Sequence, residues 1–519
     1  MSSSAESVRF SSLTPLATLA PGEHETVAVR APFTGEVLAE LAIAGPADLD
    51  YAIGIARAAL AEWASVPAKE RAEILRRFRM LLLDRGEEIL DVVQLETGKA
   101  RAHAFEELAD VALVTAYYCR VAPALLKPRR RRGAMPGLTR TVELRHPRGV
   151  VGVIAPWNYP LVLAVSDSLP AVLAGNAVIV KPDIQTTHTA LAALELLLEA
   201  GLPAGVFQVV PGDGPGTGGG LVDRVDYVSF TGSTATGRVV AQKAAARLID
   251  CSLELGGKNP MIVRADADVE RAVAGAVRGS FSNAGQLCVA TERIYVHRSV
   301  FELFLESFAA RVRQLELGAG LDYEADMGSL TYAHQLRKVE DHVRDAVTRG
   351  AILHAGGKPR FDIGPLFYEP TILTGVTPDM KLYTEETFGP VVAVAPYDSD
   401  EEAIRLANAT CYGLNASVWT RDEKAGLRIA GRIEAGAVNV NEAYAATWGS
   451  VDATLGGRKE SGSGRRHGAE GLLKFTVSQT VAVQRGRPLD LSAAWLRRSR
   501  ARSAVIAILK RFKPGSTGR

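Results

Sequence analysis

The sequence predicts an α/β protein built around a parallel, doubly wound sheet. Short apolar runs alternate with helical segments along the middle of the chain, at residues 150–155, 177–181, 206–210 and 225–230. Strands that are buried on both faces and joined by helical crossovers are typical of such a sheet. A second stretch with the same α/β pattern is expected from about residue 257 to residue 457.

The segments outside these two blocks predict surface helices and a small separate sheet. Apolar residues recur at helical spacing over residues 47–65 and 68–97, and Pro67 separates the two stretches. Residues 138–147 and 476–485 alternate apolar and polar side chains. This alternation is typical of strands with one solvated face.

The composition is that of an ordinary globular protein. Of 519 residues, 47% are apolar and 23% are charged, and the formal net charge is +2. This balance offers no global attraction for nucleic acid or for a membrane surface. The N-terminal residues lack the pattern of a signal peptide, and no apolar run is long enough to cross a bilayer. We therefore expect a cytoplasmic protein of about three domains.

The four cysteines lie far apart and form neither a CxxC pair nor a Cys/His ligand spacing. This argues against a disulfide framework and against a metal site. Other enzyme classes also lack their motifs, because there is no HExxH, no GxSxG and no Walker A sequence. Metalloprotease, serine hydrolase and P-loop functions therefore lose support.

Two glycine-rich strings are candidates for binding a phosphate group. "GPGTGG" (214–219) fits GxGxxG, but no helix is expected to begin at its third glycine, so a flexible loop is favoured. "VSFTGSTATG" (228–237) is the better candidate, because a strand is expected to end at Phe230 and a helix to open at Ser233. Amides at a helix N-terminus bind pyrophosphate, and Gly232 permits close approach of a ligand. A simple serine helix cap is the alternative.

The string "FSNAGQLCVATERIYV" (281–296) places Cys288 just before an expected strand. A lone cysteine is usually a small buried apolar residue. Five other strings accompany it, namely "APWNYP" (155–160), "KPDIQTT" (181–187), "VSFTGSTATG" (228–237), "LELGGKNP" (253–260) and "EETFGPV" (385–391). Over residues 30–485 their order and spacing resemble the aldehyde dehydrogenase superfamily. "RRHGAEGLLK" (465–474) resembles bacterial NADP-dependent succinate-semialdehyde dehydrogenases within it.

The resemblance implies the aldehyde dehydrogenase fold, with a Rossmann-like cofactor domain, an α/β catalytic domain and a small β oligomerisation domain. It assigns the cofactor domain to residues 1–137 and 148–256, and the catalytic domain to residues 257–458. Residues 138–147 and 475–485 are the expected oligomerisation strands, so a homodimer or homotetramer is implied. The basic tail, residues 486–519, has no role in the family. There a solvated or subunit-covering helix is favoured over weak membrane contact.

Three residues carry the chemistry that the resemblance implies. An aldehyde carbonyl has no leaving group, so a nucleophile must form a tetrahedral adduct before a hydride can leave. Cys288 is assigned that role. The oxyanion of the adduct is assigned to the side-chain amide of Asn158 and the backbone N–H of Cys288. Glu254 is the expected base for the water that cleaves the thioester, with a pKa raised by a poorly solvated site.

The resemblance also assigns residues to NADP, with NAD as a possible substitute. These are Trp157, Asn158, Lys181, Ile184, Gly232, Ser233, Leu255, Glu386 and Phe388. Trp157 and Ser233 are expected at the phosphates, and Glu386 at the nicotinamide ribose. Ile184 stands where NAD-preferring relatives often have a glutamate. Because a carboxylate there would repel a 2'-phosphate, its absence favours NADP.

Succinate semialdehyde, oxidised to succinate, is the substrate that the resemblance favours. Two arginines expected to hold its distal carboxylate are replaced here by Ser166 and Ser282, and Asp167 replaces a basic residue. Arg293 is a candidate to compensate. An uncharged or aromatic aldehyde is therefore the first alternative. Residues 441–462 are longer and less regular than the usual family segment, which predicts an unusual tunnel mouth.

Two other functions belong to different classes. One is a coenzyme A-acylating semialdehyde dehydrogenase, against which the expected base Glu254 argues. The other is a non-catalytic dinucleotide-binding protein, against which the complete set of Cys288, Asn158 and Glu254 argues.

Overall fold

The computed structural model describes residues 9–134, 138–485, 497 and 499–511. The chain divides into two compact units. One is formed within Met1–Leu126 and His146–Val477, and the other within Lys127–Arg145 and Ser478–Arg519. Each unit is described by itself below.

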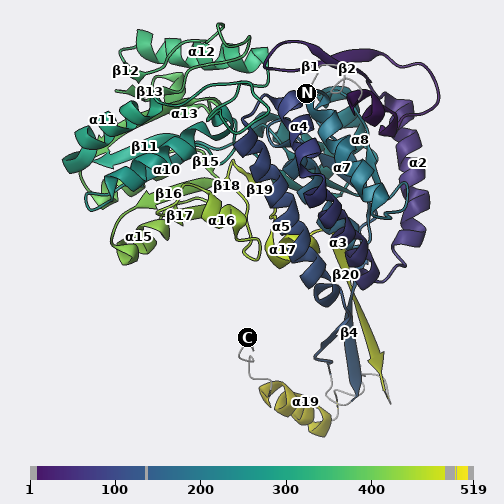
Figure 1. Ribbon diagram of the computed structural model, residues 1–519. Coiled ribbons are helices and arrows are strands. Elements are labelled where there is room, and N and C mark those ends of the chain that lie inside the picture. The colour runs from purple at the N-terminus through teal and green to yellow at the C-terminus, as the bar shows by residue number, and fades with distance from the viewer. Residues whose placement is uncertain (1–8, 135–137, 486–496, 498, 512–519) are drawn as a thin grey trace. The chain divides into compact units, whose positions relative to one another are not determined.

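A six-stranded sheet forms the first half of the larger unit (Figure 1), in the order β19-β9-β8-β5-β6-β7. Its strands are β5 (Val150–Ile154), β6 (Ala177–Lys181), β7 (Phe207–Val209), β8 (Tyr227–Thr231), β9 (Asp250–Glu254) and β19 (Gly462–Ser463). All pairs are parallel except β19 with β9. The apolar runs therefore form the predicted parallel sheet.

Helices cover both faces of this sheet because successive strand residues point to opposite sides. In β5, Val151 and Val153 pack in the cluster that contains α3 to α7, whereas Val150 and Ile154 pack with α2 and α8. These helices are α2 (Pro46–Trp63), α3 (Ala68–Asp84), α4 (Gly86–Thr97), α5 (Arg101–Leu125), α6 (Leu169–Leu173), α7 (Thr187–Glu199) and α8 (Gly219–Val222). Helix α9 (Thr234–Ala246) follows β8.

Two local predictions in this half were wrong. The helix expected over residues 68–97 is broken at Arg85, whose φ of −104° and ψ of 25° end α3 just before Gly86 begins α4. A short helix, α8, does begin at Gly219, the third glycine of "GPGTGG". Asp213 caps the preceding turn by accepting from the amides of Gly216 and Thr217, so that loop is ordered from within.

A seven-stranded sheet forms the second half, in the order β12-β13-β14-β11-β10-β16-β17. Its strands are β10 (Asn259–Val263), β11 (Thr291–His297), β12 (Ile352–Ala355), β13 (Thr371–Thr374), β14 (Val391–Tyr397), β16 (Asn415–Trp419) and β17 (Ala437–Val440), and only β12 pairs antiparallel. The helices of this half are α10 (Val269–Phe281), α11 (Phe301–Val312), α12 (Ala333–Thr348), α13 (Lys381–Thr384), α14 (Asp400–Asn408), α15 (Glu423–Ala430) and α16 (Ala445–Gly449). This is the second α/β block that the sequence predicts.

Smaller elements complete the larger unit. Strand β1 (Thr26–Arg30) pairs antiparallel with β2 (Val37–Ala42), and β15 (Tyr412–Gly413) pairs with β18 (Arg458–Lys459). Helix α17 (Gly468–Leu473) follows β19. Helix α5 is long and apolar enough to cross a membrane, but most of its apolar stretch is buried in the protein, so it is a core helix.

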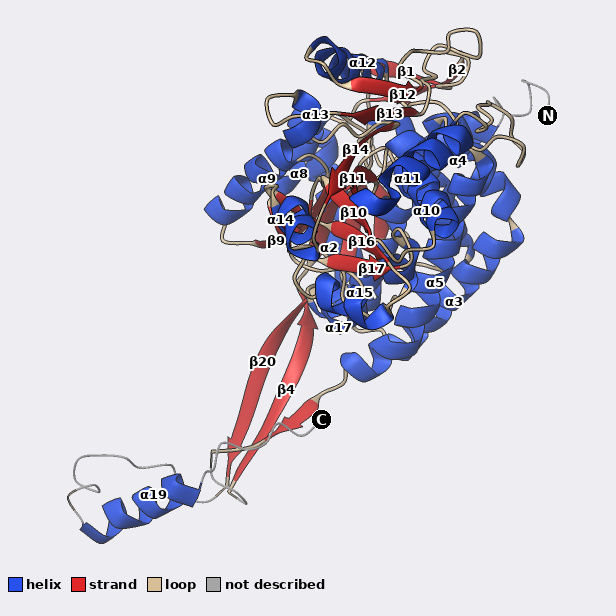
Figure 2. Cartoon of the chain, turned by 90° about the vertical axis from the view of Figure 1, so that its left-hand side faces the viewer, coloured by secondary structure: helices blue, strands red, loops and turns tan. Residues whose placement is uncertain are grey.

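The smaller unit contains a three-stranded sheet of β20 (Thr476–Gln484), β4 (Thr139–Pro147) and β3 (Arg129–Arg131), in that order (Figure 2). The two strands predicted outside the α/β blocks are therefore present. One solvated face was expected, but in this single chain β20 is exposed on both faces, including Val481 and Val483. Residues 486–496 of the basic tail lie outside the described residues, and Ser499–Arg511 form helix α19.

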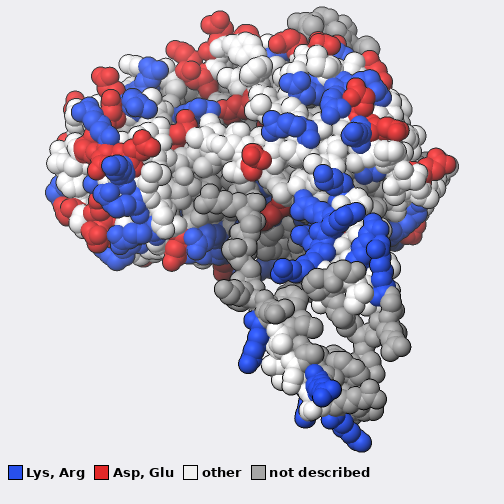
Figure 3. All heavy atoms as spheres, turned by 90° about the horizontal axis from the view of Figure 1, so that it is seen from below, with Lys and Arg blue, Asp and Glu red and all other residues white. Residues whose placement is uncertain are grey.

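Charges of opposite sign are mixed over the surface. On the left-hand half of the face shown in Figure 3, basic and acidic side chains lie beside each other. The charges there balance locally, in keeping with the net charge of +2.

Candidate active site

A strained loop carries Cys288 between α10 and β11. Asn283 and Ala284 have φ values of 51° and 53°, and Gly285 has a φ of 71°. A Cβ at Gly285 would lie 2.1 Å from the carbonyl oxygen of Gly389, so glycine is required at this position. Consecutive left-handed residues cost energy and often mark functional sites. The loop leaves Cys288 partly exposed at the edge of a cavity.

Asn158 follows β5 and lies beside this loop. Its side-chain amide donates to the carbonyl of Gln286 (2.9 Å), and its own carbonyl accepts from Asn283 Nδ2 (2.9 Å) and Lys99 Nζ (2.7 Å). Lys99 is also paired with Glu107, and both side chains are fully buried. Burial raises the pKa of the Glu107 carboxyl and lowers that of the Lys99 ammonium, although each partner opposes the other's shift. The pair fixes the backbone that presents Asn158.

Glu254 ends β9 and faces the same cavity. Among the described residues, its Oε1 atom is buried and has no hydrogen-bond partner. Burial raises the pKa of this carboxyl to about 7, although Arg466 and Lys474 oppose the shift. Burial also raises the pKa of the Cys288 thiol to about 12, again against the effect of Arg466. With these pKa values the Cys288 thiol is protonated at neutral pH. The Glu254 carboxyl is present there in both its protonated and its ionised forms, so it can accept or donate a proton.

Two cavities meet at Cys288, and both also touch Asn158 and Leu163. The first, of about 200 Å³, is lined by six of the predicted cofactor residues besides Asn158: Trp157, Gly232, Ser233, Leu255, Glu386 and Phe388. Lys181 and Ile184 do not line it. They lie at the end of β6 and in the turn that follows, so their predicted contact with the cofactor stays a prediction.

The first cavity fits the phosphate and nicotinamide parts of a dinucleotide. Ser233 caps α9 by accepting from the amide of Thr236 (3.2 Å), which leaves the helix N-terminus facing the cavity. A Cβ at Gly256 would lie 2.5 Å from Glu386 Oε2, so the backbone there must be bare. Glu386 accepts from the amide of Gly257 (2.8 Å), and burial raises its pKa to about 7.

Three residues of α12 also line this cavity and were missed by sequence reasoning: His334, Gln335 and Lys338. His334 is exposed and Lys338 is half-buried, whereas Gln335 lies on the buried face of this amphipathic helix. Nothing in the helical pattern separates a ligand-facing residue from a packed or solvated one. Gln335 Nε2 donates to the carbonyl of Phe388 (2.7 Å), so α12 also holds the Phe388 loop.

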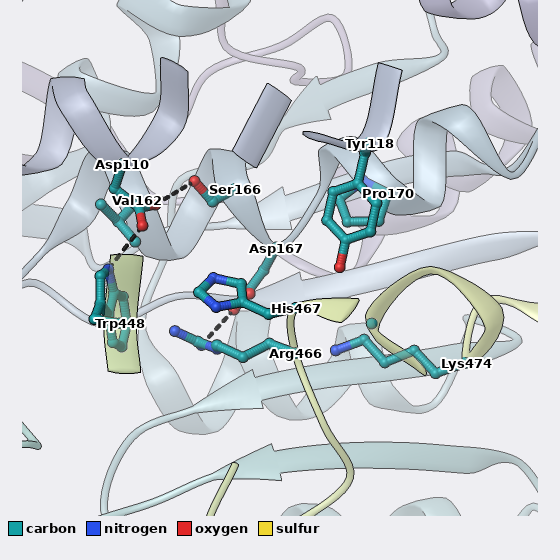
Figure 4. Close-up of a pocket in the computed structure, with 11 residues that line it drawn as sticks. Asp110, Tyr118, Val162, Ser166, Asp167, Pro170, Trp448, Arg466, His467 and Lys474 are labelled. Carbon is teal, nitrogen blue, oxygen red and sulfur yellow. Dashed lines mark hydrogen bonds and ion pairs between the residues drawn. The ribbon is translucent and has the colours of Figure 1, made fainter. Parts of the chain in front are cut away.

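A charged cluster lines a small cavity that includes Asp167, Arg466 and Lys474 (Figure 4). Arg466 Nη2 donates to Asp167 Oδ2 (2.8 Å), and both side chains are buried. Burial disfavours the Arg466 cation, but Asp167 and then Glu254 raise its pKa overall. Lys474 donates to Ser252 Oγ (3.3 Å). Arg466 and Lys474 are two of the three Lys and Arg residues of "RRHGAEGLLK", and both line this small cavity together with Asp110 and Asp167.

The second cavity, of about 290 Å³, lies on the other side of Cys288. Four of its lining residues come from the irregular segment 441–462, namely Tyr444, Ala445, Trp448 and Gly449. Tyr444 donates to Glu106 (3.1 Å), and Trp448 Nε1 donates to Asp110 Oδ1 (2.7 Å). These contacts join residues 338 positions apart, so no local pattern could have revealed them.

Arg293 was proposed to compensate for the missing arginines, and that proposal was wrong. It donates to three backbone carbonyls, those of Lys258, Leu406 and Ala407, and it lies away from both cavities. Ser166 donates to Asp110 Oδ2 (2.8 Å), and Ser282 bonds to the Tyr444 hydroxyl (3.0 Å). Neither serine lines the second cavity, but each bonds to a residue that does.

Comparison with known proteins agrees with this geometry. The sequence model described as "Aldehyde dehydrogenase family" matches residues 19–481. A protein of Mycolicibacterium smegmatis named "Putative succinate-semialdehyde dehydrogenase", with NADP(+) in its name, is 53% identical over 458 residues, which cover 88% of this chain and 89% of that protein. The "4,4'-diapolycopene aldehyde oxidase" of a Methylomonas species is 40% identical over 467 residues, covering 89% of this chain and 86% of that protein.

Solved structures resemble this chain over most of its length. The betaine aldehyde dehydrogenase of Staphylococcus aureus in complex with NAD+ has a TM-score of 0.86 and 31% identity, covering 94% of this chain and 99% of that one. An NADP-dependent enzyme of E. coli has a TM-score of 0.86 and 34% identity, covering 91% of this chain and 99% of that one.

Proposed function

The chain belongs to the aldehyde dehydrogenase family, and we propose that it oxidises its aldehyde to the free carboxylic acid with Cys288 as nucleophile. The observation that carries this proposal is the meeting of two cavities at Cys288, with Asn158 and Glu254 beside it. One cavity suits a dinucleotide and the other suits an aldehyde body. The thiol is thus held between the two molecules that must react.

In the first half-reaction the Cys288 thiol gives its proton to a water molecule and its sulfur forms a bond to the aldehyde carbon, while the carbonyl electron pair moves onto the oxygen. The oxyanion that results needs donors in a poorly solvated site. The Asn158 amide donates to the Gln286 carbonyl in this structure, so it must turn to the oxyanion when substrate is bound. NADP or NAD, when bound, supplies the acceptor for the hydride that leaves the adduct carbon. Loss of the hydride leaves a thioester on Cys288.

In the second half-reaction Glu254 takes a proton from water, whose oxygen attacks the thioester carbon. The carbon–sulfur bond breaks, the carboxylic acid leaves, and the proton held by Glu254 passes to the Cys288 sulfur, which restores both groups. A base with a pKa of about 7 suits this step, because it is ionised enough to accept the proton near neutral pH. This use of water distinguishes the proposal from transfer of the acyl group to coenzyme A.

NADP is the proposed preferred cofactor. The relative from Mycolicibacterium smegmatis has NADP(+) in its name, and Ile184 is not a carboxylate at the position expected beside the adenosine ribose. NAD remains possible, since a relative of known structure holds NAD+.

Two substrates are candidates. The names of the relatives at 51–53% identity favour succinate semialdehyde. The lining of the second cavity favours a neutral aldehyde, as does the relative named for 4,4'-diapolycopene aldehyde. Cys288, Asn158 and Glu254 would have the same roles in the oxidation of either substrate.

The domain assignment made from the sequence is retained as part of the proposal. Residues 1–137 and 148–256 would bind the dinucleotide, and residues 257–458 would supply the nucleophile. The exposed Val481 and Val483 on β20 support a subunit contact through 138–147 and 475–485, in a homodimer or homotetramer. A cytoplasmic location and a subunit-covering tail, rather than membrane contact, remain predictions.

The test is a purified-enzyme assay of several aldehydes against NADP and NAD, followed by absorbance of the reduced cofactor and identification of the product. The expected product is the free acid, formed without coenzyme A. If the product is instead a coenzyme A thioester that forms only when coenzyme A is supplied, the hydrolytic route is refuted.

A further inference from the structure

The wall of the second cavity is mostly apolar. Leu113, Val162, Leu163, Leu287 and Val289 contribute to it, together with the aromatic rings of Tyr444 and Trp448. Its volume is about 290 Å³. An engineered apolar cavity of about 150 Å³ is enough to hold benzene. The cavity therefore has room for a ring with a side chain of several carbons, which is more than a four-carbon substrate fills.

Two carboxylates stand in this apolar wall. Glu106 and Asp110 are four residues apart on α5, so they lie on the same face of the helix, one turn from each other. Each accepts a hydrogen bond from an aromatic residue of the opposite wall, Glu106 from Tyr444 and Asp110 from Trp448. The carboxylates thus anchor the segment that carries both rings.

One cation lines this cavity among the described residues, and it is already paired. Arg278 Nη2 lies 3.3 Å from Glu106 Oε1, and Nη1 lies 3.8 Å from Glu442 Oε1. Its guanidinium also lies over the Tyr444 ring, 5.2 Å from the centroid. Arg466 lines the neighbouring small cavity and is held by Asp167. An anionic substrate would meet two carboxylates and no cation that lacks a partner.

We propose that this cavity selects a neutral aldehyde with an aromatic or extended apolar body, and that Glu106 and Asp110 exclude anionic aldehydes. The inference rests on the proposed aldehyde oxidation and names its substrate class. Apolar area buried in the cavity favours the larger body, and like charges in a poorly solvated wall disfavour the anion. Succinate semialdehyde would then be a poor substrate despite the names of the relatives.

The first experiment compares matched aldehydes on the wild-type enzyme by kcat/KM with NADP. Hexanal is matched to succinate semialdehyde, and 4-methylbenzaldehyde to 4-carboxybenzaldehyde, since each pair differs mainly in its terminal charge. We expect the neutral member to be favoured by about ten-fold or more in both pairs. Preference for either anionic member would overturn the inference while leaving aldehyde oxidation intact. If no aldehyde reduces NADP or NAD, the proposed function itself fails.

The second experiment tests whether Glu106 causes the discrimination against anionic aldehydes. Glu106→Gln keeps an acceptor for Tyr444 but removes a charge, so it should raise the anionic-to-neutral ratio of kcat/KM about five-fold. Glu73→Gln is the matched control, because it removes the same charge from an exposed ion pair with Arg76 on α3. It should leave the ratio unchanged. Equal ratios in wild type and Glu106→Gln would show that Glu106 does not determine specificity.

Discussion

The cavity on the cofactor side of Cys288 is walled by consecutive residues at strand ends, whereas the cavity on the aldehyde side is walled by single side chains from distant helices. Residues 156–158, 231–233 and 254–256 all lie at the carboxyl ends of β5, β8 and β9. Parallel strands bring such ends to one edge of a sheet, which is where α/β proteins bind ligands. On the aldehyde side, α5, α10 and α16 contribute residues that nothing in the local backbone brings together.

This difference separates shared chemistry from specificity. At the carboxyl ends of β5, β8 and β9, backbone amides and glycines would contact the cofactor. Many sequences of one family can share such backbone features. The aldehyde side depends on pairs such as Glu106 with Tyr444 and Asp110 with Trp448. A change in one such pair would alter the substrate without disturbing the sheet edge. The following predictions test whether the two sides can be changed separately.

The largest effect is expected from Cys288→Ala, which removes the proposed nucleophile from the point where the two cavities meet. Turnover should fall by about 10³-fold or more, because no other group can form the covalent adduct. Binding of NADPH, followed by its fluorescence, should persist, because the cofactor side keeps its walls. Cys251→Ala on β9 is the control and should retain activity. Near-parental turnover of the Cys288 variant would contradict the mechanism.

The next effect is expected from Glu254→Gln, which should slow steady turnover about 10²-fold while a burst of NADPH persists. Hydride transfer precedes the hydrolysis that needs the base. The charge of Glu254 also helps to raise the pKa of Cys288, so its removal does not hinder thiolate formation. Stopped-flow absorbance measures both phases. A burst lost as completely as turnover would place Glu254 in the first half-reaction.

The wild-type pH profile provides a second readout of Glu254. Its raised pKa of about 7 means that the carboxylate form is present above that pH and is lost as the pH falls through it. Steady turnover should therefore fall below pH 7, in parallel with loss of the base. The burst amplitude should depend less on pH over the same range.

The sequence revealed the cofactor side far better than the aldehyde side. The apolar runs that form β5, β6 and β8 are local signals, and the Ser233 cap of α9 follows directly from a strand end. By contrast, Arg293 was placed at the aldehyde, although it binds carbonyls elsewhere. The position of the Arg293 side chain depends on how β11 packs against α14, and a local sequence motif does not reveal that contact. Glu106 and Asp110 were missed for the same reason.

The expected charge of Asp167 was also misplaced. It was thought to face the aldehyde, but Arg466 neutralises it within the small cavity that both residues line. The carboxylates that line the second cavity, Glu106 and Asp110, come from α5 instead. The expectation that negative charge disfavours an anionic substrate was therefore based on Asp167, which is the wrong residue.

On the cofactor side, Ile184→Glu should shift the ratio of kcat/KM for NADP over NAD toward NAD by about ten-fold. A carboxylate there would accept hydrogen bonds from ribose hydroxyls and repel a 2'-phosphate. Ile184→Gln is the control, because it has a similar size without the charge. The preference between hexanal and succinate semialdehyde should not change. An unchanged cofactor ratio would mean that the adenosine ribose lies elsewhere.

The smallest effect is expected on the aldehyde side, in the pH dependence of substrate preference. Burial raises the pKa of Asp110 to about 6, against the hydrogen bonds from Ser166 and Trp448. Asp110 is therefore charged above that pH and becomes neutral as the pH falls through it. The anionic-to-neutral ratio of kcat/KM should fall about three-fold as the pH rises from 5 to 8.

Taking a ratio removes the contribution of Glu254, because both aldehydes need the same base. The carboxylate of succinate semialdehyde stays ionised over most of this range, so the change reports the protein. Asp110→Asn keeps an acceptor for the Trp448 indole but cannot ionise, and its ratio should be flat with pH. If the wild-type ratio is flat as well, Asp110 does not sense the bound aldehyde. A slope that persists in the Asn variant would instead assign the titration to another group in the wall.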